Sequence, residues 1–361
     1  MKVNIQINGR WIGPDFPVYF IADIAANHDG SFERARKLIR LAKEAGADAA
    51  KFQHFEARKI VSQYGFDTLG EVKSHQSSWE KSVSEVYEEA SVPREWTEML
   101  KQECDEVGIT FFSSPYDFDA VDALDPHVPA FKIGSGDIDW LEQIEHVAKK
   151  GKPVIVASGA SSIDEVKVAM KHLLKFNSEI ILLQCNTNYT GNSENLEYLH
   201  LNVISTFREM WPNIIVGLSD HTNEVAVVLG AVALGARVIE RHFTDDTKRS
   251  GPDHHFALDP PSWHEMVVQT RLLESALGSS EKFISQNEME SVVVQRRCVR
   301  ARRDLPAGHI LDRDDIEVLR PATVGAIKPD DIQKLLGNTL SRDIKCGQDL
   351  RWEFLTARLD E

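Results

Sequence analysis

The chain is poor in the features that mark secreted, membrane and nucleic-acid-binding proteins. It has only four cysteines among 361 residues (Cys104, Cys185, Cys298 and Cys346), too far apart for a disulfide framework or a zinc site, so we expect reduced thiols. No run reaches the roughly 18 apolar residues that span a bilayer, and residues 1–6 lack the apolar core of a signal peptide. Basic residues are outnumbered, 41 against 56 acidic ones, and the net charge of −15 argues against nucleic acid or an anionic membrane as a partner. The sequence predicts a cytoplasmic protein.

What the chain does contain is a repeat of short apolar runs, each ending in polar residues and followed by a helix-like stretch. The runs are residues 18–22, 49–53, 110–113, 130–133, 154–157, 180–183, 214–218 and 238–242. The predicted helices include residues 31–45, with Ser31 as the N-cap, and residues 262–277. Eight strands that alternate with helices predict an α/β fold, a (β/α)8 TIM barrel.

Two segments lie outside this repeat. Residues 58–85 are too many for one helix and predict an irregular insertion at the rim of the active site. After residue 277 a polar connector begins, and we place the domain boundary near residue 285. Residues 1–285 then form the barrel domain, and residues 286–361, with short apolar runs and turn residues, form a small β-rich domain.

Charged residues inside two apolar runs point to an anion site. In a TIM barrel the active site lies at the carboxyl ends of the strands. An unpaired ammonium group buried there costs several kcal/mol, so we expect Lys51 and Lys132 to face an anionic ligand, with structural salt bridges as the alternative. Residues 132–137 add a Gly/Ser loop whose backbone N–H groups and hydroxyl suit phosphate. Asp23 and Asp137 suit acid–base work or sugar hydroxyls, unless they only neutralise the lysines.

Two histidines end the last two runs. His221 and His242 follow neighbouring strands of the predicted barrel, so their imidazoles can converge on one divalent ion and leave coordination positions open for a substrate. Asp220, Asp253 and His254 are candidates for the outer shell of that ion, or are polar loop residues. The sequence therefore predicts a catalytic metal.

Several segments together resemble the sialic acid (N-acetylneuraminate) synthase family. In the barrel they are residues 21–30, 51–53, 132–137, 217–222, 240–244 and 251–254; in the tail, residues 304–308, 319–321 and 337 are similar to the family's C-terminal antifreeze-like (SAF) domain. The resemblance implies a transferase that condenses phosphoenolpyruvate with an open-chain N-acylated amino sugar. The products would be a nonulosonic 2-keto-3-deoxy acid and phosphate, formed with C–O cleavage. Mn²⁺ is the implied cofactor, with Mg²⁺ or Co²⁺ as alternatives.

The resemblance also implies roles for individual residues. The catalytic set would be Asp23, Lys51, Lys132, Asp137, His221 and His242, with the two histidines holding the metal. The residues that bind phosphoenolpyruvate would be Lys51, Ser114, Lys132, Ser135, Ser158, Thr187 and Ser219, and those that bind the sugar or assist proton movement would be Asp23, Gln53, Tyr189 and Asp253. Arg320 would reach from the tail of one subunit to the sugar's acylamino group in the barrel of another, which implies a domain-swapped homodimer.

The chain departs from the family pattern in ways that leave the sugar open. Asp23 and Asp137 stand where Glu is usual, and each change withdraws a carboxylate by about 1.5 Å. Ala157 replaces a common Ser or Thr, and Thr190 a frequent Pro. Legionaminic, pseudaminic and other nonulosonic acids are therefore as compatible with the sequence as sialic acid. Two residues of the insertion are further candidates for substrate contact, His75 and Gln76.

Three other interpretations compete with this one. A synthase of another 3-deoxy-2-ulosonic acid, acting on a phosphorylated sugar, keeps the barrel but lacks the tail domain. A metal-dependent hydrolase of the amidohydrolase type needs a His-x-His pair after the first strand, where this chain has Asn27 and His28. A carbohydrate-binding or ice-binding protein would leave both lysines and both histidines at the strand ends unexplained.

Overall fold

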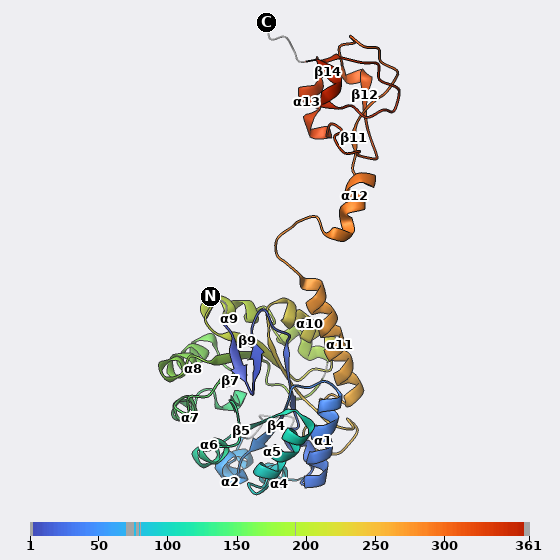
Figure 1. Ribbon diagram of the computed structural model, residues 1–361. Helices are drawn as coiled ribbons and strands as arrows, with labels where there is room; N and C mark the ends of the chain where they lie inside the picture. Colours follow the sequence, from blue (N-terminus) through green and yellow to red (C-terminus); the bar gives the residue numbers. More distant parts are fainter. Residues whose placement is uncertain (1–2, 70–75, 77–78, 80, 192, 357–361) are drawn as a thin grey trace. The chain divides into compact units, whose positions relative to one another are not determined.

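The structure is a computed structural model that describes residues 3–69, 76, 79, 81–191 and 193–356. The chain divides into two compact units, Met1–Gly278 and Ser279–Glu361 (Figure 1). All four cysteines are free. In the described part of the chain, no helix is long and apolar enough to cross a membrane.

The first unit is built around eight parallel strands. They are β3 (Tyr19–Asp23), β4 (Ala49–His54), β5 (Thr110–Pro115), β6 (Phe131–Ile133), β7 (Val154–Ala157), β8 (Ile180–Cys185), β9 (Ile215–Asp220) and β10 (Val238–His242). Their hydrogen-bonded order is β5-β4-β3-β10-β9-β8-β7-β6, and the end strands β5 and β6 contact each other. Each predicted apolar run contributes one strand, so the predicted barrel is confirmed.

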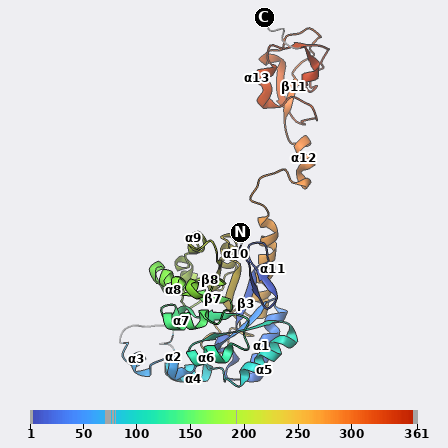
Figure 2. The ribbon, with the colours of Figure 1, turned by 60° about the vertical axis from the view of Figure 1, so that its left-hand side comes forward.

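Helices form a ring outside the strands (Figure 2). They are α1 (Phe32–Glu44), α5 (Trp96–Val107), α6 (Phe118–Leu124), α7 (Leu141–Ala148), α8 (Ile163–Phe176), α9 (Val203–Met210), α10 (Val225–Ala233) and α11 (Pro260–Leu277). Helix α1 confirms the predicted cap, because the Ser31 side chain accepts a hydrogen bond from the backbone N–H of Arg34. Helix α11 begins two residues before the predicted start, since Asp259 caps it and proline is favourable in a first turn.

The predicted insertion is more regular than expected. It contains the short helices α2 (Ala57–Ile60) and α3 (Gln63–Asp67) and the start of α4 (Val83–Ala90). Ser82 and Glu85 form a reciprocal capping box at the start of α4, a local signal that the sequence analysis did not use. A hairpin of β1 (Ile5–Ile7) and β2 (Arg10–Ile12) precedes the barrel and was not predicted.

Alternation along the strands divides the apolar residues into two layers. One set, which includes Phe20, Phe52 and Val156, packs against the helices. The other set, which includes Ile21, Phe112 and Leu183, joins the N-terminal hairpin in a separate cluster. Both layers consist of almost fully buried side chains, each of which contributes roughly 1.5–3 kcal/mol by leaving water. This burial holds the strand ends that carry the polar residues.

The second unit is small and rich in short strands, as its sequence predicts. It contains α12 (Met289–Val294), β11 (Cys298–Ala301), β12 (Ile316–Leu319), α13 (Ile332–Leu335), β13 (Thr339–Leu340) and β14 (Leu355–Thr356). Strand β11 pairs antiparallel with β12, and β13 with β14. Its own apolar cluster includes Val299, Leu311, Ile316, Leu335 and Leu350.

Candidate active site

A cavity of about 330 Å³ opens where the barrel strands end. Its lining includes six predicted site residues: Gln53, Ser135, Asp137, Tyr189, His242 and Asp253. Gln76 of the insertion also lines it, as expected, whereas His75 lies outside the described residues. The strands thus bring together side chains that are more than 200 residues apart in the chain.

Each buried lysine has a carboxylate partner. Lys51 Nζ lies 2.6 Å from Asp23 Oδ2, and both side chains are nearly inaccessible to solvent. Lys132 Nζ lies 3.4 Å from Glu240 Oε1 and donates to the carbonyl oxygen of Ile133 at 3.0 Å. Burial alone lowers the pKa of Lys51, but Asp23 and Glu240 outweigh it and raise the pKa, so this lysine stays charged.

These pairs correct one expectation about neutralisation. Asp23 is the counterion of Lys51, as the structural alternative required, but the carboxylate paired with Lys132 is Glu240 rather than Asp137. Glu240 lies in the segment 240–244 that carries the family resemblance, but no role was predicted for it. Lys51 and Lys132 stand out in the sequence because each is a charged residue inside an apolar run. Glu240 is also a charged residue inside such a run, so the sequence contains the same signal for it.

The predicted phosphate-binding hydroxyls lie beside the lysines or beside one another. Ser114 Oγ is 3.5 Å from Lys51 Nζ, and Ser219 Oγ donates to Glu240 Oε1 at 3.3 Å. The hydroxyl of Thr187 donates to that of Ser135 at 3.0 Å. The six residues named here lie in, or directly after, six different strands (β4, β5, β6, β8, β9 and β10), so barrel closure brings this group together.

Ser158 differs from the other predicted hydroxyls because its hydrogen-bonding capacity is largely used. Its Oγ donates to the Gln184 side chain at 3.2 Å and accepts from the backbone N–H of Cys185, also at 3.2 Å. To donate to a phosphate oxygen, the Ser158 hydroxyl has to leave Gln184.

The two predicted metal ligands face each other. The ring centroids of His221 and His242 are 5.5 Å apart, and both rings contact Tyr189 and Phe256. His221 Nδ1 lies 2.9 Å from the carbonyl oxygen of Asn186, an arrangement that leaves Nε2 to act as a ligand. His242 Nδ1 is buried and has no hydrogen-bond partner among the described residues.

These observations fit a divalent cation with an incomplete protein shell. Two carboxylates lie close to His242, with Asp23 Oδ2 at 3.7 Å from Nε2 and Asp253 Oδ2 at 3.9 Å from Nδ1. Within the described part of the chain, no three His, Cys, Asp or Glu side chains are close enough to hold a metal by themselves. The protein would therefore supply the two imidazoles, and water or substrate the remaining ligands.

The pKa values of the two histidines move in opposite directions. Burial lowers the pKa of His242 to about 3, which keeps its imidazole neutral. Burial also acts to lower the pKa of His221, but the neighbouring Cys185 side chain outweighs it and raises the pKa. Cys185 is thus a further residue of the site, and nothing in its spacing from other cysteines identified it.

Asp137 is the carboxyl group best suited to carry a proton. Burial raises its pKa to about 6, and the Coulombic effect of Lys132 reduces that rise. Its Oδ2 has no hydrogen-bond partner within the described residues. A carboxyl with a raised pKa in a cavity is the usual arrangement for a general acid.

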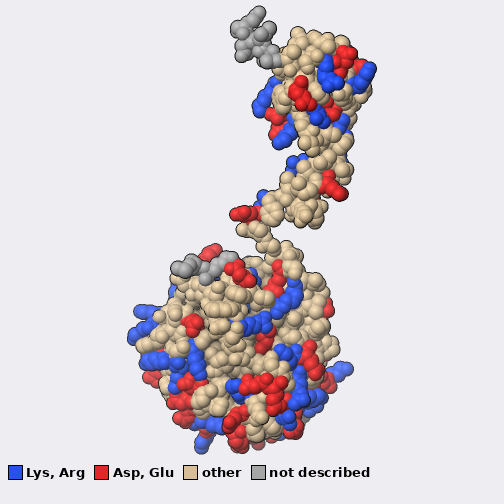
Figure 3. Space-filling model, viewed as in Figure 1, with Lys and Arg blue, Asp and Glu red and all other residues tan. Residues whose placement is uncertain are grey.

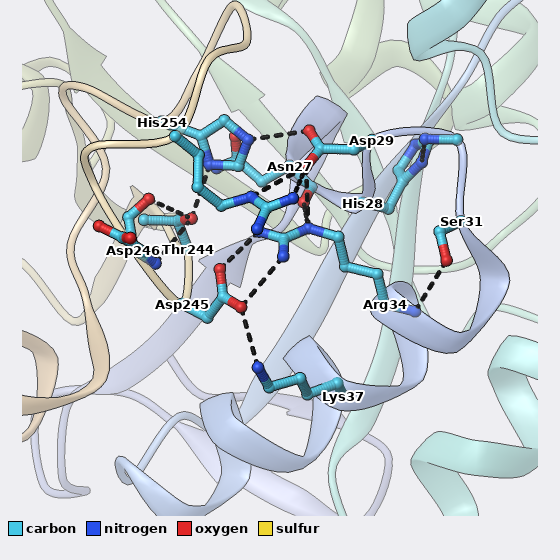
Figure 4. Close-up of polar contacts among 12 residues, drawn as sticks. Asn27, His28, Asp29, Ser31, Arg34, Lys37, Thr244, Asp245, Asp246 and His254 are labelled. Carbon is cyan, nitrogen blue, oxygen red and sulfur yellow. Dashed lines mark hydrogen bonds and ion pairs between the residues drawn. The ribbon is translucent and has the colours of Figure 1, made fainter.

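Asp253 is the chain neighbour of His254, which belongs to a polar network with Thr244 and Asp29; Figure 4 shows that network. Asp253 Oδ2 accepts from the backbone N–H of Ala26 at 3.2 Å. The next residue, His254, is fully buried and bonds Thr244 Oγ1 at 2.7 Å and Asp29 Oδ1 at 2.9 Å. This network joins the loop after β10 to the loop after β3 and so fixes one wall of the cavity.

Three further aromatic residues of the site were not predicted. Phe55, Tyr87 and Tyr116 line the cavity, and Phe55 packs against both tyrosines at centroid distances of 5.4 and 5.8 Å. Phe55 and Tyr116 directly follow strands and Tyr87 lies in α4, so only the tertiary structure brings the three together. Arg320 belongs to the second unit, where it is exposed and its Nε donates to the carbonyl oxygen of Gln295 at 2.6 Å.

Comparison with known proteins identifies the family. Residues 38–282 match the model of the NeuB family, and residues 296–356 match the SAF domain. The chain is 36% identical over 333 residues to human N-acetylneuraminate-9-phosphate synthase, which covers 91% of this chain and 90% of that protein. It is 32% identical over 366 residues to N,N'-diacetyllegionaminic acid synthase of Legionella pneumophila, with 99% and 100% covered.

A solved structure agrees with these relatives. The crystal structure of N-acetylneuraminic acid synthetase from Leptospira borgpetersenii superposes with a TM-score of 0.70 at 28% identity, and the match covers 81% of this chain and 96% of that chain. The family match covers most of the barrel, and the SAF match covers the tail domain. The chain belongs to the NeuB family and is an enzyme of the acid-synthase type that its relatives represent.

Proposed function

We propose that this enzyme condenses phosphoenolpyruvate with an open-chain N-acylated amino sugar, giving a nonulosonic acid and inorganic phosphate. The observation that carries the proposal is the convergence of two buried lysines, a set of hydroxyls and two facing histidines at one end of the barrel. The relatives support the product class, because they are named as synthases of N-acetylneuraminate 9-phosphate and of diacetyllegionaminic acid.

Phosphoenolpyruvate matches the charges of the site. Its carboxylate and phosphate are attached to the same carbon, so they need two cationic groups close together. Lys51 and Lys132 supply these groups, and their carboxylate partners Asp23 and Glu240 hold them in place before the substrate arrives. Ser114, Ser135, Thr187 and Ser219 would donate to the anionic oxygens, and Ser158 would join them by exchanging its bond to Gln184.

His221 and His242 would hold a divalent cation, with Mn²⁺ the first choice. When bound, such an ion supplies Lewis-acid polarisation of the acceptor's aldehyde oxygen. Phe256 and Tyr189 pack edge-on against both imidazoles and limit the access of water to them. Gln53 and Asp253 line the same cavity and would orient the sugar hydroxyls.

The carbon–carbon bond forms when the C2=C3 π electrons of phosphoenolpyruvate attack the aldehyde carbon. Asp137 would give its proton to the aldehyde oxygen, a role that fits its raised pKa of about 6. Water then adds at C2, the bond between C2 and the phosphate oxygen breaks, and phosphate leaves while C2 becomes a ketone. The reaction therefore proceeds with C–O cleavage.

We also propose that the active unit is a cytoplasmic, domain-swapped homodimer. Among the described residues of its own unit, Arg320 has only a local backbone partner, and its exposed guanidinium is able to bind an acylamino oxygen. In this arrangement each barrel would be completed by Arg320 from a second copy of the chain.

The test is phosphate release from phosphoenolpyruvate with Mn²⁺, measured against a panel of free and 6-phosphorylated N-acylated hexosamines. We expect release that depends on one sugar, stops with a chelator and returns with Mn²⁺, and yields a product with the mass of a nine-carbon keto acid. Phosphoenolpyruvate labelled with ¹⁸O in the bridging position should pass the label to phosphate. Sugar-independent phosphate release, or retention of the label in the organic product, would contradict the proposal.

A further inference from the structure

A buried ion pair lies directly behind the two histidines. Asp220 on β9 and Arg241 on β10 are register partners, one residue before His221 and His242 respectively. Arg241 Nε is 3.3 Å from Asp220 Oδ2, and the two side chains are 1% and 0% exposed. Because successive side chains of a strand point to opposite faces, this pair faces the helix layer while the histidines face the cavity.

The Asp220 carboxylate also fixes the chain on the far side of His221. Its Oδ1 accepts from the backbone N–H of Thr222 at 3.0 Å, and its Oδ2 accepts from the Thr222 hydroxyl at 3.1 Å. The carboxylate therefore spans His221, from the residue before it to the residue after it. On the other strand, Arg241 contacts the sulfur of Met266 on α11 at 3.9 Å, and its Nη2 has no partner among the described residues.

Stability does not explain such a pair. Taking two charges out of water costs several kcal/mol per ion, and replacing a buried ion pair with apolar side chains is often neutral or stabilising. The arginine here is not even fully satisfied, because one of its terminal nitrogens has no acceptor in the described structure. The buried pair therefore calls for an explanation other than stability.

We infer that Asp220 and Arg241 are positioning residues that hold His221 and His242 at the mutual distance needed to share one divalent cation. The inference rests on the metal role in the proposed function. The Asp220 carboxylate links the backbone around His221 to Arg241 on β10, the strand that carries His242. Loss of this ion pair would let the two imidazoles move independently. Loss of the ion pair should therefore weaken metal binding more than it lowers the stability of the fold.

The experiment measures Mn²⁺ binding to the full chain without substrate, from the electron paramagnetic resonance signal of free Mn²⁺. The variants are Asp220→Asn, Arg241→Met and the double variant, which contains no unpaired buried charge. We expect each to weaken Mn²⁺ binding about 10- to 100-fold, the range typical of residues that orient metal ligands. The double variant should keep the melting temperature of the unsubstituted protein and still bind weakly, and Arg241→Lys should recover part of the affinity.

Glu103→Gln is the matched control. Glu103 is also a buried carboxylate, 3% exposed, and binds Arg36 and Arg40 between α1 and α5. It should lower stability without changing Mn²⁺ affinity. Binding by the double variant within about twofold of the unsubstituted protein, or equal weakening by Glu103→Gln, would overturn the inference while leaving the proposed reaction intact. An unsubstituted protein that binds no Mn²⁺ would remove the metal role itself, and this inference with it.

Discussion

At the scale of single residues, burial and the nearest partner determine what each carboxyl group of the site is able to do. Asp137 and Glu240 are both carboxyl groups of the site, and each has one oxygen without a hydrogen-bond partner among the described residues, but Glu240 also lies 3.4 Å from Lys132 Nζ. Desolvation without a partner favours the neutral form of a carboxyl group. Asp137 is therefore able to donate a proton, and Glu240 is placed to orient a lysine.

Asp137→Asn tests the proton donor. The variant removes the acid, so kcat should fall about 10²- to 10⁴-fold, while the KM for phosphoenolpyruvate stays within a few-fold. Steady-state phosphate release measures both constants. If Asp137→Asn keeps the full kcat, another group donates the proton.

The same residue should affect stability with pH. Its folded pKa of about 6 lies above the usual pKa of 3.8 for an aspartate, so the stability that it contributes is complete below pH 4 and is lost as pH rises through about 6. Asp137→Asn removes this loss. Above pH 7 the free energy of unfolding of the variant should exceed that of the unsubstituted protein by up to about 2–3 kcal/mol. Denaturant titrations at pH 5 and pH 8 would show it, and a gain that is equal at both pH values would contradict the assignment.

A glycine lies against two of the hydroxyls proposed to bind phosphoenolpyruvate. Gly159 has a φ of +56°, and a Cβ atom there would lie 2.4 Å from Ser135 Cβ and 2.9 Å from Thr187 Oγ1. Gly159→Ala should therefore push these two hydroxyls apart and raise the KM for phosphoenolpyruvate at least tenfold, with some loss of stability. Gly151→Ala is the control, because its φ is +72° but a Cβ there meets nothing within 4 Å. An equal KM in the two variants would mean that backbone strain, and not the clash, is responsible.

At the scale of elements, the barrel supplies the charged groups and the insertion supplies a wall. Helix α4 contributes Val86, Tyr87 and Ala90 to the cavity, and none of its residues is fully buried. A helix of 8 residues without a fully buried side chain is marginal by itself, so its N-terminal cap matters. The position of this wall depends on local capping rather than on the barrel core.

Ser82→Ala tests that dependence. Loss of the capping box should cost about 1 kcal/mol locally and raise the sugar KM without affecting the KM for phosphoenolpyruvate. Ser162→Ala is the matched control, since Ser162 forms the same capping box with Glu165 at the start of α8. Because α8 lies outside the cavity lining, that variant should lose similar stability and keep the sugar KM. Parallel kinetics and thermal melts of the two variants distinguish the outcomes.

At the scale of the whole molecule, the charge of −15 coexists with the site proposed above for an anionic substrate. On the face drawn in Figure 3, acidic and basic side chains are interspersed over the first unit. The anion site is instead buried, where two lysines act over short distances in a low dielectric and net surface charge has little effect. Net charge therefore excludes classes of partner but does not describe the active site.

Arg320 tests the proposed assembly. Arg320→Ala should raise the sugar KM, whereas Arg313→Ala, which removes another exposed arginine of the same unit, should not. Neither Arg320→Ala nor Lys132→Ala should be fully active alone. In a domain-swapped dimer, co-expression of the two should restore about a quarter of the sites, because half of the dimers are mixed and each has one complete site. Absence of any recovery in mixed dimers would place Arg320 in its own barrel's site.

The sequence by itself determined the barrel, the tail domain and the family. Short apolar runs and capped helices are local signals, and the charged residues inside the runs stand out because charge is rare in such strands. Ser31 and the run ending at His242 are examples in which local pattern and final structure coincide.

Only the tertiary structure decided how those residues are partnered. It paired Lys132 with Glu240, committed the Ser158 hydroxyl to Gln184, set Cys185 against His221 and placed Arg241 behind His242. These contacts join residues from different strands, and their geometry depends on barrel closure and on which face each side chain takes. No spacing along the chain encodes those distances, because they arise when the strands come together.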